Sequence, residues 1–288
     1  MPSQTFKAIG TTWQIDIKDT ESTPDTSSIF SAIRGRIELF ESQYSRFRKD
    51  SLVTQISDEA GIYQFPPDGK ILFGMYRKLY DLSDGKVTPL IGQTLVDTGY
   101  DPEYSLTPKE IIQPTLLWDN VMKYDDETNT LTTFVPIQLD FGALGKGYIV
   151  DVVSEMIMAA GIQDFTVDAG GDMHHRGEAI RVGLEHPENP EQAIGIAEIL
   201  NCSICGSSGN RRAWNKYHHI INPETQESPR DIIAIWVVAD STMLADGLTT
   251  ALFFTDPEKL KGSVSFEYIL VRADGSAFIS PNFPGSLF

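Results

Sequence analysis

The sequence has only two cysteines, Cys202 and Cys205, which form a single Cys-Ser-Ile-Cys motif. A zinc site of the common kind needs further sulfur or nitrogen ligands at a fitting spacing, and the chain has no second Cys-x-x-Cys. A redox pair and half of a zinc site remain alternatives. The neighbouring Ile199, Leu200 and Ile204 are typical of a buried strand, so we expect the two cysteines to be structural thiols.

Positive charge is also scarce. The chain carries 23 Lys and Arg residues against 40 Asp and Glu residues, which gives a net charge of −17. A nucleic-acid partner would require a basic face, so we expect none. Any phosphate ligand must be held locally, and a pyrophosphate would favour a divalent cation, because an acidic protein and an acidic ligand otherwise repel each other.

Long apolar runs are missing as well. The first residues, MPSQTFKAIGTTWQIDI, alternate like a strand and contain no signal peptide or lipidation cysteine, and the chain has no apolar stretch of about 20 residues. We therefore expect a cytoplasmic protein without a membrane partner. The hydrophobic content of 41% and charged content of 22% are ordinary for a soluble globular protein, and 288 residues permit one large domain or two small ones.

The most informative stretch runs from Asp140 to Gly147, with the sequence DFGALGKG. It follows a predicted hairpin of two strands, over Trp118 to Tyr124 and Leu131 to Leu139, and enters a predicted helix that ends at Gly161. Glycines let the backbone approach a ligand closely, and unpaired N–H groups at a helix N-terminus attract anions. Lys146 adds a positive charge. The spacing matches neither a Walker loop nor the usual dinucleotide motif, so a phosphate site and a tight turn with a solvated lysine remain alternatives.

A second candidate site lies on a helix predicted to open at residues 240–242. Asp246 and Thr250 stand four residues apart, so their side chains share one face of that helix. Carboxylate and hydroxyl oxygens suit a hard cation such as Mg²⁺. The alternative is a solvated aspartate beside a threonine that bonds its own helix backbone.

Histidines and one aromatic residue complete the candidates. The pairs His174-His175 and His218-His219 match no zinc template, although an imidazole near a phosphate can act as a general base. Phe47 stands within a charged segment and is either a packed loop anchor or a platform that stacks on a planar ligand. No Gly-x-Ser-x-Gly motif is present, which gives no support to an α/β-hydrolase.

Taken in order, these stretches resemble the ApbE-type FAD:protein FMN transferases over nearly the whole chain. The matching pieces are Gly10-Thr11-Thr12, the segment from Ser45 to Ser51, Asp84-Gly85 with Thr88-Pro89, Asp140 to Gly147, Asp168 to Asp172, Ser208-Gly209-Asn210, His218 to Pro223, and Ala245 to Leu252.

The resemblance implies a fold and an extent. We expect an α+β protein of the T-fold-like ApbE architecture, with mixed sheets backed by helices and an FAD cleft between two lobes. We also expect residues 1–288 to form a single flavin transferase domain. The interleaved strands and amphipathic helices agree with this class but do not select the topology.

The resemblance also implies site residues. Mg²⁺ would be bound by the backbone carbonyl of Ala143 and the side chains of Asp246 and Thr250, and Thr249 stands where some family members place a further carboxylate. His219 fits the family histidine near the reacting phosphate and is our candidate base, with Lys146 as a second catalytic residue. The residues expected to contact FAD are Ile9, Phe47, Thr88, Asp140, Lys146 and His219.

The reaction implied is the Mg²⁺-dependent transfer of FMN from FAD to a Ser or Thr hydroxyl of a target flavoprotein, with release of AMP. Phosphoryl transfer requires mainly positioning and charge neutralisation, which such a site supplies. One alternative is an FAD pyrophosphatase, in which water is the nucleophile and FMN and AMP are released. Another is a flavin-binding or flavin-storing protein without turnover, if the substitutions near Asn222 and Thr249 disarm the site. In the loop of Asn222, this residue replaces the usual Asp of the family and Gln226 the usual Gly.

Overall fold

The structure is a computed structural model that describes residues 2–18 and 26–288, and it is an α+β protein. Within these ranges no helix combines the length and apolar character needed to cross a membrane. The helices are α1 (Thr26–Tyr44), α2 (Leu52–Asp58), α3 (Asp68–Leu82), η1 (Pro89–Ile91), α4 (Gly92–Asp97), α5 (Trp118–Val121), α6 (Gly145–Ala159), α7 (Thr242–Ala251) and α8 (Pro257–Lys261).

An eight-stranded sheet forms the centre of the molecule. Its strands, in spatial order, are β1 (Ser3–Ala8), β2 (Thr11–Ile17), β6 (Phe165–Ala169), β7 (Asp172–Arg176), β10 (Cys202–Ser208), β13 (Ile232–Ala239), β14 (Glu267–Arg272) and β15 (Ala277–Ile279). Every neighbouring pair of described strands in it is antiparallel, so the expectation of mixed sheets is wrong. Short connections account for the antiparallel pairs β1–β2, β6–β7 and β14–β15, because parallel neighbours need long crossovers.

Three smaller sheets accompany it. One has the order β16 (Gly285–Leu287), β9 (Asn189–Ile199) and β8 (Ile180–His186); the second has β3 (Ile62–Gln64), β5 (Thr130–Thr133) and β4 (Met122–Asp125); the third pairs β11 (Ala213–Trp214) with β12 (Tyr217–His218). The β4–β5 hairpin is where we expected it, but the predicted strand over 131–139 ends at Thr133. The predicted strand over 118–124 begins instead with helix α5.

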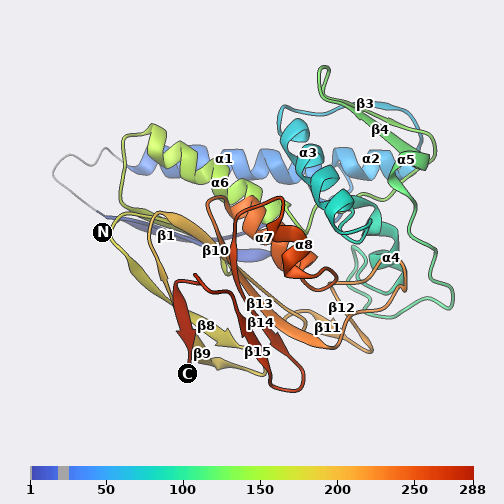
Figure 1. Ribbon diagram of the computed structural model, residues 1–288. Coiled ribbons are helices and arrows are strands. Elements are labelled where there is room, and N and C mark those ends of the chain that lie inside the picture. Colours follow the sequence, from blue (N-terminus) through green and yellow to red (C-terminus); the bar gives the residue numbers. More distant parts are fainter. Residues whose placement is uncertain (1, 19–25) are drawn as a thin grey trace.

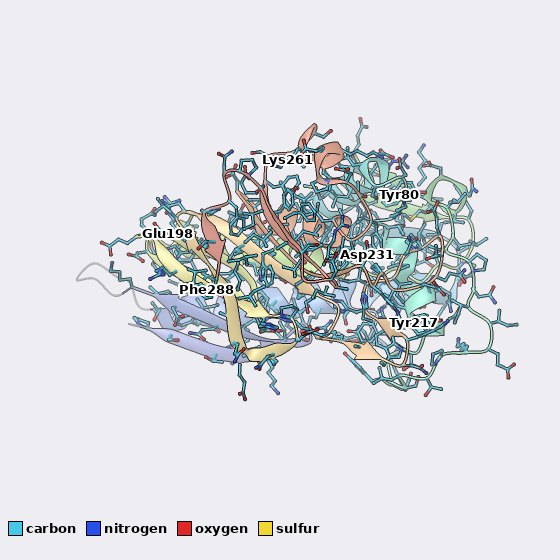
Figure 2. The ribbon with its side chains drawn as sticks, turned by 60° about the horizontal axis from the view of Figure 1, so that its bottom comes forward. Tyr80, Glu198, Tyr217, Asp231, Lys261 and Phe288 are labelled. Carbon is cyan, nitrogen blue, oxygen red and sulfur yellow. The ribbon has the colours of Figure 1, made fainter. Side chains whose placement is uncertain are left out.

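The central sheet is buried on both faces, as the continuous apolar run of β13 predicts. Ile235 and Val237 of β13 point into a core shared with the helices, whereas Trp236 and Val238 point into a second core shared with β8 and β9. Figure 1 shows α1 and α6 above the sheet and β8 and β9 below it. In Figure 2, Phe288 and Glu198 mark the side of the sheet formed by β16, β9 and β8, and Tyr217 lies toward the opposite end of the molecule.

Helices α6 and α7, almost a hundred residues apart in sequence, are joined at two points. Asp151 of α6 caps the N-terminus of α7, because its carboxylate accepts the backbone N–H groups of Thr242 and Met243 at 2.8 and 2.9 Å. Gly147 allows close approach, since a Cβ there would lie 2.4 Å from the Thr242 carbonyl oxygen. This junction brings the glycine turn beside Asp246.

Candidate active-site cleft

A cleft of about 550 Å³ opens where the glycine turn, α7 and the loops after α1 and α3 meet. This volume lies within the range of small-molecule sites. Its wall includes every residue that the sequence resemblance places in the site. These are Ile9, Phe47, Thr88, Asp140, Ala143, Lys146, His219, Asp246 and Thr250.

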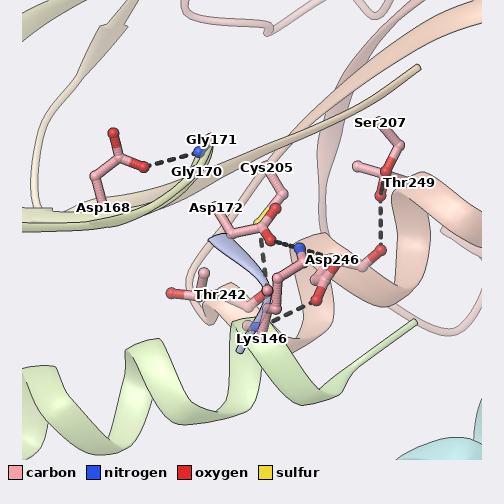
Figure 3. Close-up of polar contacts among 12 residues, drawn as sticks. Lys146, Asp168, Gly170, Gly171, Asp172, Cys205, Ser207, Thr242, Asp246 and Thr249 are labelled. Atoms are coloured by element: carbon pink, nitrogen blue, oxygen red, sulfur yellow. Dashed lines mark hydrogen bonds and ion pairs between the residues drawn. The ribbon is translucent and has the colours of Figure 1, made fainter. Parts of the chain in front are cut away.

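Lys146 lies between two buried carboxylates. Its ammonium nitrogen contacts Asp172 Oδ2 directly and lies 3.8 Å from Asp246 Oδ1 (Figure 3). Asp172 is only 2% exposed and Asp246 only 3%. One cation therefore faces two carboxylates in a region of low dielectric, and the cluster keeps an excess of negative charge when both are ionised.

This excess fits a cation at the Asp246 end of the cluster. Burial raises the pKa of Asp246, against the opposing effects of Lys146 and of the Gly147 N–H group, which donates to Asp246 Oδ2 at 3.0 Å. Thr250 and Ala143 line the same wall, so a carboxylate, a hydroxyl and a backbone carbonyl are available, and these are oxygen donors of the kind that Mg²⁺ prefers. The alternative of a solvated aspartate on an exposed helix face is wrong, because Asp246 is buried.

The described residues contain no group of three or more His, Cys, Asp or Glu side chains arranged to hold a metal. A site built from Asp246, Thr250 and a main-chain carbonyl is not such a group, because Asp246 is the one carboxylate among these three ligands. Thr249, where some relatives carry a further carboxylate, is fully buried; its hydroxyl donates to the Asp246 carbonyl oxygen and pairs with Ser207 at 2.8 Å. Thr249 is thus a buried, hydrogen-bonded residue that adds no charge to the site.

The glycine turn itself differs from the expected anion site with unpaired amides. The N–H of Gly142 donates to Asp140 Oδ1 at 2.7 Å, that of Gly145 to the Phe141 carbonyl oxygen at 2.7 Å, and that of Gly147 to Asp246. Three of the amides thus bond the protein's own oxygens. These three amides are therefore not available to an anion, whereas the Lys146 ammonium group lines the cleft.

Asp140 is held from two sides. Besides the Gly142 amide, its carboxylate accepts Arg46 Nε at 2.5 Å. Arg46 is 4% exposed, and its guanidinium carbon lies 4.2 Å from the ring centroid of Phe47 and 4.9 Å from that of Tyr100. The guanidinium is therefore fixed by one ion pair and two cation–π contacts.

Phe47 is already in contact with other rings. Tyr104, which is half exposed, stacks on it with centroids 5.3 Å apart and planes 18° apart. No further ring fits between two rings at this separation. Phe47 is thus both a packed anchor and part of the cleft wall, and stacking of a planar ligand on this face requires Tyr104 to move.

The histidines separate clearly by environment. His219 lines the cleft, its Nδ1 has no hydrogen-bond partner among the described residues, and burial lowers its pKa to about 3. His174 bonds Ser203, and His175 bonds Thr166 and the Glu178 carbonyl oxygen, away from the cleft wall. These two imidazoles fill structural roles, which leaves His219 as the cleft histidine.

Two further expected residues shape the wall through the backbone. Ile9 has a left-handed backbone conformation with φ of 50°, and its N–H donates to Glu41 Oε1 at 3.0 Å. Thr88 caps η1, because its hydroxyl accepts the Leu90 N–H at 3.2 Å. Both residues line the cleft.

Sequence reasoning missed several cationic residues of the cleft. Arg211 donates to the Gly170 carbonyl oxygen at 2.8 Å, and Arg212 donates to the Tyr100 hydroxyl at 2.9 Å. Five lining residues are cationic and three are acidic, although the whole chain is strongly acidic. The Arg211-Arg212 pair after Ser208-Gly209-Asn210 was the signal available, but nothing local in the sequence shows that this loop faces the glycine turn.

The two cysteines lie on opposite faces of β10. Cys205 is fully buried with its Sγ 3.5 Å from the Thr242 carbonyl oxygen, and Cys202 is half buried; both are free thiols. Burial raises the pKa of each thiol. These features agree with the structural role expected of the pair.

Comparison with known proteins gives a consistent result. The model of the ApbE family matches residues 9–268. An FAD:protein FMN transferase of Vibrio cholerae is 24% identical over 87% of this chain and 80% of that protein, and one of Escherichia coli K12 is 22% identical over 98% and 88%.

Solved structures share the fold. The flavin transferase ApbE of Vibrio cholerae superposes with a TM-score of 0.83 at 19% identity, covering 98% of this chain and 97% of that one. The ApbE protein of Thermotoga maritima gives a TM-score of 0.85 at 20% identity, with 97% of each chain covered. At these identities the structural likeness concerns the fold alone.

Proposed function

This chain belongs to the ApbE family, and on that premise we propose that it is a Mg²⁺-dependent FAD:protein FMN transferase. The observation that carries the proposal is the single cleft that gathers the glycine turn, Lys146, His219 and the buried Asp246. The names of the relatives in Vibrio cholerae and Escherichia coli support the same activity.

The proposed reaction moves FMN from one oxygen to another. The hydroxyl oxygen of a Ser or Thr in a target flavoprotein attacks the phosphorus on the FMN side of the FAD pyrophosphate. The bond from that phosphorus to the bridging oxygen breaks, AMP leaves with the bridging oxygen, and FMN remains ester-linked to the acceptor. The hydroxyl proton must be taken up as the new bond forms.

The residues of the cleft would act mainly through charge and position. Asp246, Thr250 and the Ala143 carbonyl would hold Mg²⁺, which supplies charge neutralisation for the pyrophosphate. Lys146, fixed by Asp172, would hold a phosphate oxygen. Because Asp172 binds the lysine tightly, the ammonium group stays in the cleft wall and loses little freedom when a substrate binds.

His219 would take the hydroxyl proton. Its lowered pKa, caused first by burial and then by the charges of Arg212 and His218, means that it is neutral and able to accept a proton at neutral pH. A pKa near 3 gives little driving force for that transfer. The negative charge of a bound pyrophosphate would stabilise the imidazolium and raise this pKa toward the working range.

The test incubates purified protein with FAD and Mg²⁺, with and without a candidate acceptor protein that carries an exposed Ser or Thr. Transferase activity gives flavin fluorescence on the acceptor that survives denaturing electrophoresis, together with AMP. Release of free FMN and AMP instead would identify a pyrophosphatase that uses water. Unchanged FAD with every acceptor, despite binding, would identify a flavin-binding protein and refute the transferase.

A further inference from the structure

Two nitrogens of the Arg46 guanidinium, at the wall of the cleft, form no hydrogen bond with the described residues. Its Nε is bonded to Asp140, but Nη1 and Nη2 are buried and have no hydrogen-bond partner among the described residues. A buried donor without a partner costs free energy, and a guanidinium that leaves two nitrogens unpaired requires an explanation. Since Arg46 lines the cleft, a bound ligand is the direct explanation.

The charge around Arg46 indicates which part of a ligand it would meet. The Asp140 carboxylate lies 2.5 Å from Nε, so the ion pair is already neutral, and a phosphate placed there would also face that carboxylate. A neutral carbonyl oxygen meets no such repulsion. The cleft has other cations for phosphate, namely Lys146 and the Arg211-Arg212 pair.

The shape around Arg46 points the same way. Phe47 and Tyr100 flank the guanidinium, and Tyr104 is the half-exposed ring that closes this aromatic cluster. Both Nη atoms are shielded from solvent, so a ligand reaches them only when a neighbouring group of the cleft wall moves. An aromatic ring system that carries carbonyl groups on its edge satisfies both the aromatic surroundings and the unpaired donors.

We propose that Arg46 is a substrate-binding residue that recognises the imide edge of the flavin ring. The Nη atoms donate to a ring carbonyl oxygen, and the Asp140 carboxylate is placed to accept the adjacent ring N–H. The proposal rests on the proposed function, because it assumes that flavin is the substrate, and it goes beyond that function in assigning Arg46 to the ring rather than to the phosphates.

The test compares three ligands on the wild type and on Arg46→Lys. Riboflavin carries the ring without phosphate, ADP carries the pyrophosphate without the ring, and FAD carries both. Lysine keeps the positive charge opposite Asp140 but lacks the planar pair of amino groups. We expect Arg46→Lys to weaken the binding of riboflavin and of FAD by about tenfold or more, and to leave the binding of ADP unchanged within about twofold.

Arg48→Lys is the matched control. Arg48 follows Arg46 by two residues, forms ion pairs with Glu38 and Asp50, and does not line the cleft. This variant should bind all three ligands as the wild type does. A second measurement changes the ligand and needs no variant at the site. Methylating N3 of riboflavin removes the ring N–H that Asp140 would accept, so it should weaken riboflavin binding to the wild type.

Two results would overturn the inference alone. One is unchanged riboflavin binding by Arg46→Lys, and the other is an equal loss of riboflavin and ADP, which would show a contact to phosphate or a general change in the cleft. A wild-type protein that binds neither FAD nor riboflavin would overturn the proposed function together with the inference.

Discussion

Replacing Asp246 with asparagine tests the charge balance of the cleft. Asparagine has nearly the same shape and its side-chain oxygen can still accept the Gly147 N–H, but the carboxylate charge is lost. The ion pair of Lys146 with Asp172 then remains as a neutral pair. Because the wild type buries two carboxylates beside one lysine, we expect Asp246→Asn to be at least as stable as the wild type without metal.

In the presence of Mg²⁺ we expect the wild type to be more stable than Asp246→Asn. A cation that binds the folded protein at one hundred times its dissociation constant stabilises it by about 2.7 kcal/mol. For a chain of this size, that corresponds to a rise in melting temperature of about 5 °C or more. The wild type should show this rise with Mg²⁺, and Asp246→Asn should show almost none, together with a loss of Mg²⁺-dependent turnover.

The assay is thermal melting with EDTA and with increasing Mg²⁺, and the matched control is Asp231→Asn. Asp231 is an exposed carboxylate that precedes β13 and does not line the cleft, so this variant should respond to Mg²⁺ as the wild type does. An equal Mg²⁺ response in Asp246→Asn would refute the metal assignment. A fall of several degrees in its metal-free melting temperature would refute the argument from buried charge.

Three further predictions concern neighbouring groups. Asp172→Asn frees Lys146 to pair with Asp246 and compete with the cation, so the Mg²⁺ concentration for half-maximal turnover should rise about tenfold, and an unchanged value would contradict this role. His219 has a folded pKa of about 3 against 6.5 unfolded, so the unfolded chain binds the extra proton between these values and stability is lost as the pH falls below 6.5. In urea unfolding, His219→Asn should reduce that loss by up to about 1.4 kcal/mol per pH unit, whereas an identical pH slope would exclude His219 as its source. Cys205 should react with Ellman's reagent only on unfolding and Cys202 slowly before it, while fast reaction of both would favour a redox pair.

Local patterns in the sequence predicted much of the element order. The alternation of Trp13, Ile15 and Ile17, the apolar run of β13 and the helix that ends at Gly161 all correspond to observed elements, because each depends on periodicity or on a glycine with positive φ. The strand predicted over 131–139 was too long, because β5 ends when its partners β3 and β4 end, and strand length is a property of the pairing.

For the candidate site, the sequence identified several residues, but their burial and their partners depend on the fold. Residue type and spacing selected Lys146, Asp246 and His219, helped by the family resemblance. Whether Asp246 is solvated or buried depends on Asp151 and Gly147, which dock α6 against α7. The partners of the glycine-turn amides likewise depend on side chains from other segments.

By itself, the sequence determined the family, the acidic character and the glycine turn with its lysine, because these are properties of composition and of neighbouring residues. Only the tertiary structure decided that Asp172 binds Lys146, that Tyr104 stacks on Phe47 and that two nitrogens of Arg46 have no hydrogen-bond partner in the part of the chain that the structure describes. The physical reason is that burial and electrostatic contact depend on distance in space, and these residues are brought together by packing between segments far apart in the chain.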